Sequence, residues 1–401
     1  MRILQLASRL PYPLTDGGAI GIFKPTEAIA KLGHEITFVT FPDVDPNITN
    51  IATKKFSEFC RLELVGRPLP SRTATLLRTM FSGAYPIERR MMPEMFELLE
   101  KLLTQNTYDI VHLDASHMGK YGLWIKERFG LPVLLRQHNF ETQIYERFAK
   151  NAKNPLAAIV AKIHARRLRV EESKFLQGLD CIVAISAEDE RLMRELAPRT
   201  KFRIVPAGVD TSYFTPQPIE LEEDTVLWVG GMDWDPNKDA VEFFAKEIYP
   251  LIVERLPHTT FSIVGAGTES LTSLNVQHSG RIRLHGRVKD IRSELAKAKV
   301  MICPLRVGGG MRLKLLDFFA AGKAVVSTHI GAEGNVGADG VHLLLRDDPR
   351  SFGEAVISLL EDDSLRRSLG ENARALAEQT YSWQSIARQF STIYEEVAAS
   401  R

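Results

Sequence analysis

The sequence predicts an α/β protein made of two Rossmann-like domains that face each other across a cleft. With 401 residues, the chain is long for one core and suits two domains of about 150–200 residues. Short runs of consecutive apolar residues, as expected of strands buried on both faces, alternate with amphipathic stretches of helical period. This alternation occurs twice, on either side of a proline-rich connector, and it favours two parallel sheets covered by helices.

The expected strands come at intervals along both halves of the chain. They span residues 3–7, 35–40, 110–113, 132–137 and 181–185 in the first half, and residues 226–229, 260–264, 282–284, 300–303 and 324–327 in the second. Helical patterns lie between them, most clearly over residues 21–32, 140–175, 239–255 and 311–321. Parallel strands end at one edge of each sheet, where α/β proteins bind ligands, so the cleft is the expected site.

The connector at residues 206–224 contains three prolines and ends in an acidic run, which is typical of a linker. We therefore assign residues 1–205 to a first domain and residues 206–380 to a second. Residues 381–401 contain a further helical pattern that follows two others without an intervening strand. We expect this C-terminal helix to pack back towards the first domain.

Composition excludes several classes of protein. No apolar run approaches the roughly 20 residues of a membrane-spanning helix, and the N-terminus lacks the apolar segment of a signal peptide. The three cysteines are far apart, so neither a zinc site nor a disulfide framework is expected, and a reducing, cytoplasmic location fits. A net charge of +1 without interleaved basic and aromatic residues disfavours nucleic-acid binding.

The charge is nevertheless uneven between the two halves. Residues 1–205 carry 30 Lys and Arg against 23 Asp and Glu, whereas residues 206–401 carry 21 against 27. A basic first half suggests an anionic partner, and peripheral contact with the inner face of a membrane is one expectation. Residues 67–92 and the arginine cluster at 166–169 could provide it. A loop and helix covering the sheet, and a solvated helix face, are the alternative interpretations of these segments.

Two motifs of the first half follow expected strands. Asp16, Gly17 and Gly18 precede a helical pattern, and the glycines would let a phosphate approach the positive end of that helix. Without a full GxGxxG spacing, a plain tight turn explains them equally well. His138, in the segment RQHNFET, stands where a Rossmann-like sheet places ligand-facing residues, although a structural role is an equal alternative.

Glycines also end two strands of the second half. Gly230 and Gly231 lead into a polar turn and a helix with Lys238 near its start, and Gly265 follows the next strand in the segment IVGAG. A strand–turn–helix arrangement of this kind suits phosphate binding. One glycine pair is weak evidence, but their recurrence at strand ends is a stronger indication.

The strongest motif is VGGGMRLKLLDFF at residues 307–319. Three glycines precede a helix with Arg312 and Lys314 in its first turn. Cations are unfavourable at the positive end of a helix dipole, so we expect an anion such as a diphosphate to offset them. Asp317, one to two turns further on, could reach ribose hydroxyls.

These motifs, in this order, resemble those of glycosyltransferase family 4, whose members have the GT-B fold. The resemblance rests on VPAGVDTSYF, GGMDWDPNKDAVEFF, IVGAG, LHGRVKDI, GGGMRLKLLDFFAAGKAVVST and NARALAEQTYSW, and it covers nearly the whole chain. It implies transfer of a sugar from a nucleotide donor, a UDP- or GDP-sugar, to a hydroxyl acceptor with retention of configuration. No metal and no cofactor are implied, because basic groups and helix ends would hold the diphosphate.

The resemblance also implies roles for individual residues. Arg312 and Lys314 would hold the diphosphate, Asp317 would contact the ribose, and His138 would lie near the transferred sugar. Further donor contacts are implied for Gly17, Gly18, Gly231, Lys238, Gly265, Arg287, Val288, Gly309, Gly310 and Met311, with Arg287 and Val288 next to the base.

The sequence departs from the family pattern at several positions. The family commonly has two glutamates eight positions apart, but these positions are Gly309 and Asp317 here, so the first carboxylate is missing. Met232 and Ala207 replace a common Arg and a common Asn. These departures leave the donor sugar open more than the class of reaction.

The leading hypothesis is therefore a metal-independent hexosyltransferase in cell-surface polysaccharide or glycolipid synthesis. The first domain would bind a saccharide or lipid-linked acceptor and the second the nucleotide-sugar. One alternative is a nucleotide-sugar epimerase of the same fold, which would turn over its donor without an acceptor. Another is a non-catalytic nucleotide-sugar-binding protein. A dinucleotide oxidoreductase is disfavoured, because no expected strand leads into GxGxxG with an acidic residue about 20 positions on.

Overall fold

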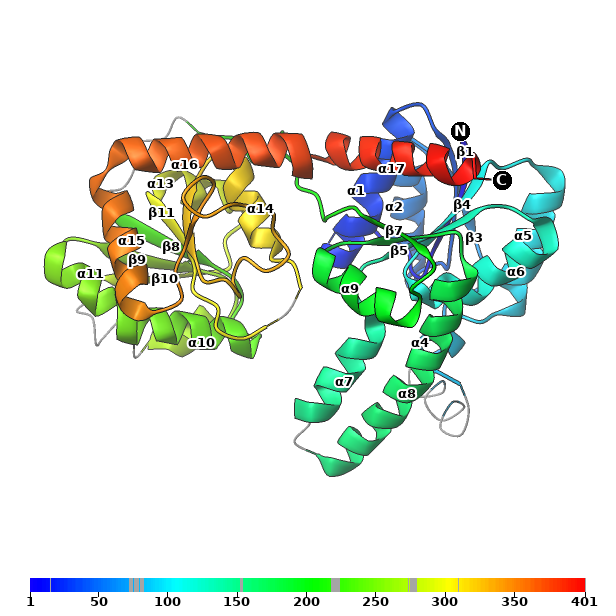
Figure 1. Ribbon diagram of the computed structural model, residues 1–401, viewed down its shortest axis with the longest axis horizontal. Helices are drawn as coiled ribbons and strands as arrows, with labels where there is room; N and C mark the ends of the chain where they lie inside the picture. Colours follow the sequence, from blue (N-terminus) through cyan, green and yellow to red (C-terminus); the bar gives the residue numbers. More distant parts are fainter. Residues whose placement is uncertain are drawn as a thin grey trace. The chain divides into compact units, whose positions relative to one another are not determined.

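The computed structural model of the protein divides into two compact units (Figure 1). It describes residues 1–14, 16–71, 75, 79, 83–151, 154–217, 224–272, 274, 280–308 and 310–400. Unit 1 comprises Met1–Pro206 and Ile386–Arg401, and unit 2 comprises Ala207–Ser385. Each unit contains one parallel sheet with helices, which confirms the prediction of two Rossmann-like domains.

Unit 1 has a seven-stranded sheet with the order β3-β2-β1-β4-β5-β6-β7. Its strands are β1 (Arg2–Ala7), β2 (Glu35–Thr40), β3 (Arg61–Leu64), β4 (Ile110–Asp114), β5 (Val133–Gln137), β6 (Cys181–Ala184) and β7 (Lys201–Ile204). Its helices are α1 (Gly17–Lys31), α2 (Pro46–Phe56), α4 (Tyr85–Glu88), α5 (Pro93–Gln105), η1 (Ser116–Met118), α6 (Gly119–Phe129), α7 (Glu141–Asn151), α8 (Pro155–Gly178) and α9 (Ala187–Leu196). All residues of β4, β5 and β6 are buried. Most of them are apolar, as expected of central strands, and the buried polar residues are His112, Asp114, Arg136 and Gln137.

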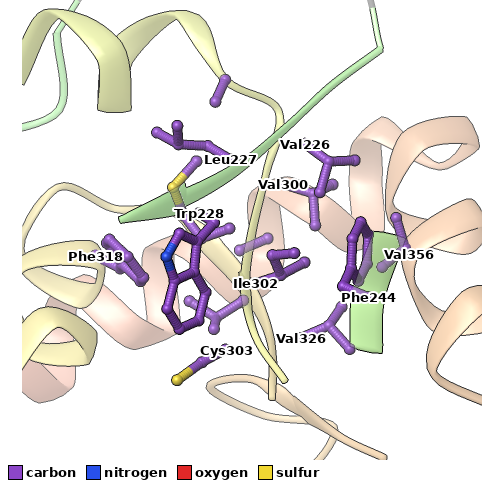
Figure 2. Close-up of a cluster of buried hydrophobic side chains, with 14 of the residues drawn as sticks. Val226, Leu227, Trp228, Phe244, Val300, Ile302, Cys303, Phe318, Val326 and Val356 are labelled. Atoms are coloured by element: carbon purple, nitrogen blue, oxygen red, sulfur yellow. The ribbon is translucent and has the colours of Figure 1, made fainter. Parts of the chain in front are cut away.

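Unit 2 has a six-stranded sheet with the order β10-β9-β8-β11-β12-β13. Its strands are β8 (Thr225–Val229), β9 (Thr260–Val264), β10 (Ile282–Gly286), β11 (Val300–Cys303), β12 (Ala324–Ser327) and β13 (Leu344–Leu345). Its helices include α10 (Asp235–Phe243), η2 (Phe244–Ile248), α11 (Tyr249–Arg255), η3 (Thr268–Leu271), α13 (Arg292–Lys297), α14 (Leu313–Ala320), α15 (Pro349–Glu361), α16 (Asp363–Leu376) and η4 (Ala377–Tyr381). Trp228 is fully buried in its core, next to side chains such as Ile302 and Phe318 (Figure 2).

Three strands of the described chain were not predicted. They are β3, β7 and β13, and each lies at an edge of its sheet. An edge strand has one neighbour and is only partly buried, so its sequence lacks the continuous apolar run on which the prediction rests.

The prediction of a single helix over residues 140–175 is wrong. The chain forms α7 and α8, which lie side by side as a hairpin that extends from unit 1 (Figure 1). Pro155 disfavours helical backbone at the preceding residue and suits the first turn of a new helix, which explains the break.

The helix predicted over residues 239–255 is longer and less regular than expected. It begins at Asp235, and a π-helical turn over Phe244–Ile248 separates α10 from α11. Pro250, in the first turn of α11, has no N–H for an α-helical bond to the preceding turn.

The last helix, α17 (Trp383–Ala398), returns the chain to unit 1. Tyr394 Oη lies 2.6 Å from His112 Nδ1, and the ring of Phe390 stacks on the His112 ring at 5.3 Å. Arg203 Nη2 also donates to Glu396 Oε2 at 2.7 Å. The helix is thus attached to the sheet of unit 1 through its buried face.

Candidate functional site

In unit 2 the strand order reverses between β8 and β11. Loops that leave the carboxyl ends of two such strands diverge, and the space between them is where doubly wound sheets bind ligands. Gly230 and Gly231 follow β8, and the glycine-rich segment before α14 follows β11. Two glycine motifs of the sequence therefore lie at the switch point.

The loops after β8, β9 and β10 are joined through their backbones. Gly230 N–H donates to Val264 O at 2.8 Å, and Gly265 N–H donates to Gly286 O at 2.8 Å. Gly265 has a φ of 154°, and a Cβ there would lie only 2.1 Å from Gly230 O. The sequence predicts Gly265 as a ligand contact, but close packing of two loops already requires a glycine at this position.

Lys314, in the first turn of α14, reaches the carboxyl end of β8. Its Nζ lies 3.7 Å from the centroid of the Trp228 ring and 3.4 Å from Asn237 Oδ1. A Cβ at Gly230 would lie 2.9 Å from this Nζ, so the glycine leaves room for the ammonium group. Burial, with the nearby charge of Arg312, lowers the pKa of Lys314 to about 8.

Arg312 immediately precedes α14 and is 6% exposed. The helix begins at Leu313, so Arg312 occupies the N-cap position rather than the first turn predicted from the sequence. Its Cζ lies 5.5 Å from the centroid of the Trp234 ring, and a Cβ at Gly308 would collide with its Nη2. Arg312 and Lys314 therefore place two cations at the positive end of one helix.

Asp317 lies one turn further along α14. Burial raises the pKa of its carboxyl group to about 7. Within the described chain, no residue forms a hydrogen bond or ion pair with this side chain. The contact of this carboxyl group with a ribose therefore stays a prediction.

The other predicted donor contacts are spread along the same edge of the sheet. Gly231 O accepts a hydrogen bond from Asn237 Nδ2 at 2.8 Å, and Lys238 is half-buried in the first turn of α10. Arg287 and Val288 follow β10, two strands from β8, where Arg287 is exposed and Val288 packs against the core.

Two of the remaining predicted contacts, Gly310 and Met311, lie in the glycine-rich loop itself. Gly310 has a φ of 81°, and Met311 is adjacent to Gly334, where a Cβ would lie 3.1 Å from Met311 Cα. Gly309, where the family commonly has a glutamate, lies outside the described residues.

His138 follows β5 in unit 1 and lies beside Asp114, the last residue of β4. His138 Nε2 lies 3.2 Å from Asp114 Oδ1, and Gln5 Nε2 donates to Asp114 Oδ2 at 2.5 Å. Although burial opposes it, electrostatic interaction with His112, the hydrogen bond from His138 and the charge of Arg136 lower the pKa of Asp114 to about 2. Burial lowers the pKa of His138, so a neutral ring that donates to an ionised carboxylate fits this pair.

Asp114 was missed in the sequence, although a signal for it exists. It directly follows a run of buried strand residues, as Gly230 does after β8, and the carboxyl ends of β1 and β4 form the switch point of this sheet. Applying the strand-end rule to β4 would have found it.

The predicted glycine turn at Gly17 and Gly18 is the first turn of α1. Asp16 caps that helix by accepting a hydrogen bond from Ala19 N at 3.0 Å, and Arg9 pairs with the Asp16 carboxylate. The hydrogen bond from Arg9 is the main reason that the pKa of Asp16 is lowered. The Asp16 carboxylate thus caps the positive end of α1, and the contact of Gly17 and Gly18 with a phosphate stays a prediction.

No helix in the described part of the chain is long and apolar enough to span a bilayer. Among the same residues, no three His, Cys, Asp or Glu side chains gather in a way that could hold a metal ion.

Comparison with known proteins agrees with this architecture. The family model described as Glycosyltransferase Family 4 matches residues 16–213, and the model described as Glycosyl transferases group 1 matches residues 223–362. The chain is 33% identical over 321 residues to a phosphatidyl-myo-inositol mannosyltransferase of Mycolicibacterium smegmatis, covering 78% of this chain and 77% of that one. The chain belongs to the GT-B glycosyltransferases.

Solved structures share the fold of this glycosyltransferase. Sucrose-phosphate synthase from Thermosynechococcus elongatus is similar over 100% of both chains, with a TM-score of 0.70 and 18% identity. Anabaena Alr3699/HepE in complex with UDP has a TM-score of 0.66 and 14% identity, and covers 99% of this chain and 100% of its own. At these identities the similarity concerns the fold.

Proposed function

We propose that this glycosyltransferase moves a hexose from a nucleoside-diphosphate sugar to a hydroxyl acceptor with retention of configuration and without a metal ion. The main support is the pair of cations at the start of α14, Lys314 and Arg312, both largely withdrawn from solvent. Keeping both charged at a positive helix end is costly, and a diphosphate carries enough negative charge to offset them.

In the proposed reaction, the bond between the anomeric carbon and the diphosphate oxygen breaks while the acceptor oxygen bonds to the same face of the sugar. Arg312 and Lys314 stabilise the charge that develops on the leaving diphosphate, and a diphosphate oxygen takes the proton of the acceptor hydroxyl. Electrostatic stabilisation of this kind contributes on the order of several kcal/mol. The Asp317 carboxyl group would bind the ribose.

His138 is proposed to lie near the transferred sugar. The ionised carboxylate of Asp114 fixes the orientation of its ring, because the hydrogen bond at 3.2 Å needs the proton on Nε2. Asp114 is thus a positioning residue that acts through His138.

The names of similar proteins support the classes of donor and acceptor. The HepE structure contains UDP, and the mycobacterial relative is named for mannosyl transfer to a phosphatidyl-myo-inositol. We therefore propose a UDP- or GDP-sugar as donor and a lipid-linked or saccharide hydroxyl as acceptor. Synthesis of a glycolipid or a cell-surface polysaccharide is the process that would need this reaction.

The first experiment measures thermal stabilisation by UDP, GDP and ADP. One nucleotide at about 100 times its Kd should stabilise the protein by about 2.7 kcal/mol. Arg312→Ala should abolish this stabilisation, whereas Arg367→Ala, which removes an exposed arginine from α16 of the same unit, should preserve it. If the nucleotide stabilised both variants equally, its binding site would not include Arg312, and the proposed diphosphate site would be wrong.

The second experiment follows transfer from the sugar donors of that nucleotide to extracted lipids and oligosaccharides, with product configuration determined by NMR. Arg312→Ala should lower turnover about 100-fold or more, and EDTA should have no effect. Conversion of donor in the absence of acceptor would indicate the epimerase, and binding without turnover the non-catalytic protein. An inverted product or loss of activity with EDTA would contradict the proposed mechanism.

A further inference from the structure

The hairpin of α7 and α8 exposes large apolar side chains on both of its helices. Phe148 of α7 is 58% exposed and Ile159 of α8 is 54% exposed, and Ile144, Val160 and Ile163 are also exposed. Both helices extend away from the sheet of unit 1 (Figure 1). Apolar side chains that gather on one exposed element mark an interaction surface.

A groove of about 640 Å³ lies between the two helices. Aliphatic and basic side chains line it together, with Ile159 and Ile163 contributing apolar surface from α8. Its four cations are Arg147, Lys150, Lys162 and Arg166. All four are exposed, and within the described chain none of them has an ion-pair partner.

The surrounding sequence has the same sign of charge. Residues 141–170 contain seven Lys and Arg against two Glu. One of these glutamates, Glu146, lines the groove and lies 3.7 Å from Arg169, so the groove carries four cations against one carboxylate. The surface therefore combines exposed apolar groups with an excess of positive charge.

We propose that this hairpin docks on an anionic phospholipid bilayer. The aliphatic and aromatic side chains would enter the boundary between headgroups and acyl chains, and the four cations would bind lipid phosphates. A second copy of the chain is the other occupant of such a groove, but two hairpins of like charge repel each other. The proposal concerns binding alone and does not depend on the proposed reaction.

Co-sedimentation of the full-length protein with vesicles tests this proposal. We expect binding to vesicles of phosphatidylcholine and phosphatidylglycerol at 3:1, weak binding to phosphatidylcholine alone, and a decrease in binding as salt is raised. Each Lys or Arg near an anionic surface contributes about fivefold to the affinity. Replacing the four groove cations by Gln should therefore weaken binding to anionic vesicles by roughly several hundredfold.

A matched variant controls for the loss of overall charge. Lys54→Gln, Lys101→Gln, Arg199→Gln and Arg388→Gln together remove four exposed cations from other surfaces of unit 1. This variant should bind the anionic vesicles within a few-fold of the wild type. If both variants lost binding equally, the net charge of the protein would explain the binding, and the assignment of the membrane surface to the hairpin would be wrong.

The apolar contribution is tested separately with Phe148→Gln, Ile159→Gln and Ile163→Gln. These side chains are exposed, so unfolding temperature should stay unchanged while the affinity for vesicles falls by about tenfold or more. Absence of wild-type binding to anionic vesicles would overturn the proposal, as would a lipid-free dimer that the hairpin substitutions dissociate. Nucleotide stabilisation measured on the same variants shows whether the donor site is intact, which separates this result from the proposed function.

Discussion

Lys314→Met should make the glycosyltransferase more stable and nearly inactive. The wild-type protein buries an ammonium group beside Trp228 and a second cation, Arg312, and this burial lowers the pKa of Lys314 from 10.5 to about 8. The pKa falls because the folded state disfavours the charged form. A methionine fills a similar volume without any charge, so the variant avoids this cost.

The size of the effect follows from the pKa. A tenfold change in a protonation equilibrium corresponds to about 1.4 kcal/mol, so the drop from 10.5 to about 8 corresponds to about 3 kcal/mol. The variant also loses the cation–π contact with Trp228, which is worth about 1 kcal/mol. The net gain in the free energy of unfolding is then about 2 kcal/mol, or about 4–8 °C in Tm for a domain of this size.

The pH dependence distinguishes this cause from a general improvement in packing. The unfolded chain keeps the Lys314 proton up to about pH 10.5, whereas the folded protein releases it above about pH 8. The cost to folding is therefore complete below pH 8, and it fades as the pH rises from 8 to 10.5.

Scanning calorimetry of both proteins at pH 7 and pH 10 provides the measurement. The difference in stability should be present at pH 7 and small at pH 10, while transfer by the variant is at least about 100-fold slower. A variant that is less stable than the wild type at pH 7, or a difference that does not change with pH, would refute the reasoning.

Three further predictions concern the scaffold around the two switch points. Gly265→Ala should lower the free energy of unfolding by at least about 2 kcal/mol in urea titration, because its Cβ would overlap the carbonyl oxygen after β8; a smaller loss would mean that the two loops can separate. Asp114→Asn should reduce turnover by about 10–100-fold while the folded state persists, because the neutral amide has one acceptor oxygen where the carboxylate serves both His138 and Gln5; unchanged turnover would mean that this pair has only a structural role. Tyr394→Phe removes the 2.6 Å contact with His112 and should cost about 1 kcal/mol in the same titration, and no change would show that water replaces it.

The central strands and the cation-bearing loop were predictable from local sequence. A strand buried on both faces is mostly apolar, and β6 and the first residues of β4 and β5 show this directly, whereas buried polar residues end β4 and β5. Edge strands such as β3 were missed, because a partly buried strand lacks a continuous apolar run. The break between α7 and α8 was missed, because only a single proline indicates it in the sequence.

The sequence by itself determined that the chain has two parallel α/β domains and that Arg312 and Lys314 follow a glycine loop at a strand end. These features depend on periodicity and on neighbours along the chain, which the sequence displays. Only the tertiary structure decided that Lys314 contacts Trp228, that Asp114 orients His138, and that Asp16 occupies the end of α1. Burial and charge pairing arise between residues far apart in the chain, so the chemical state of each group appears only once the strands lie side by side.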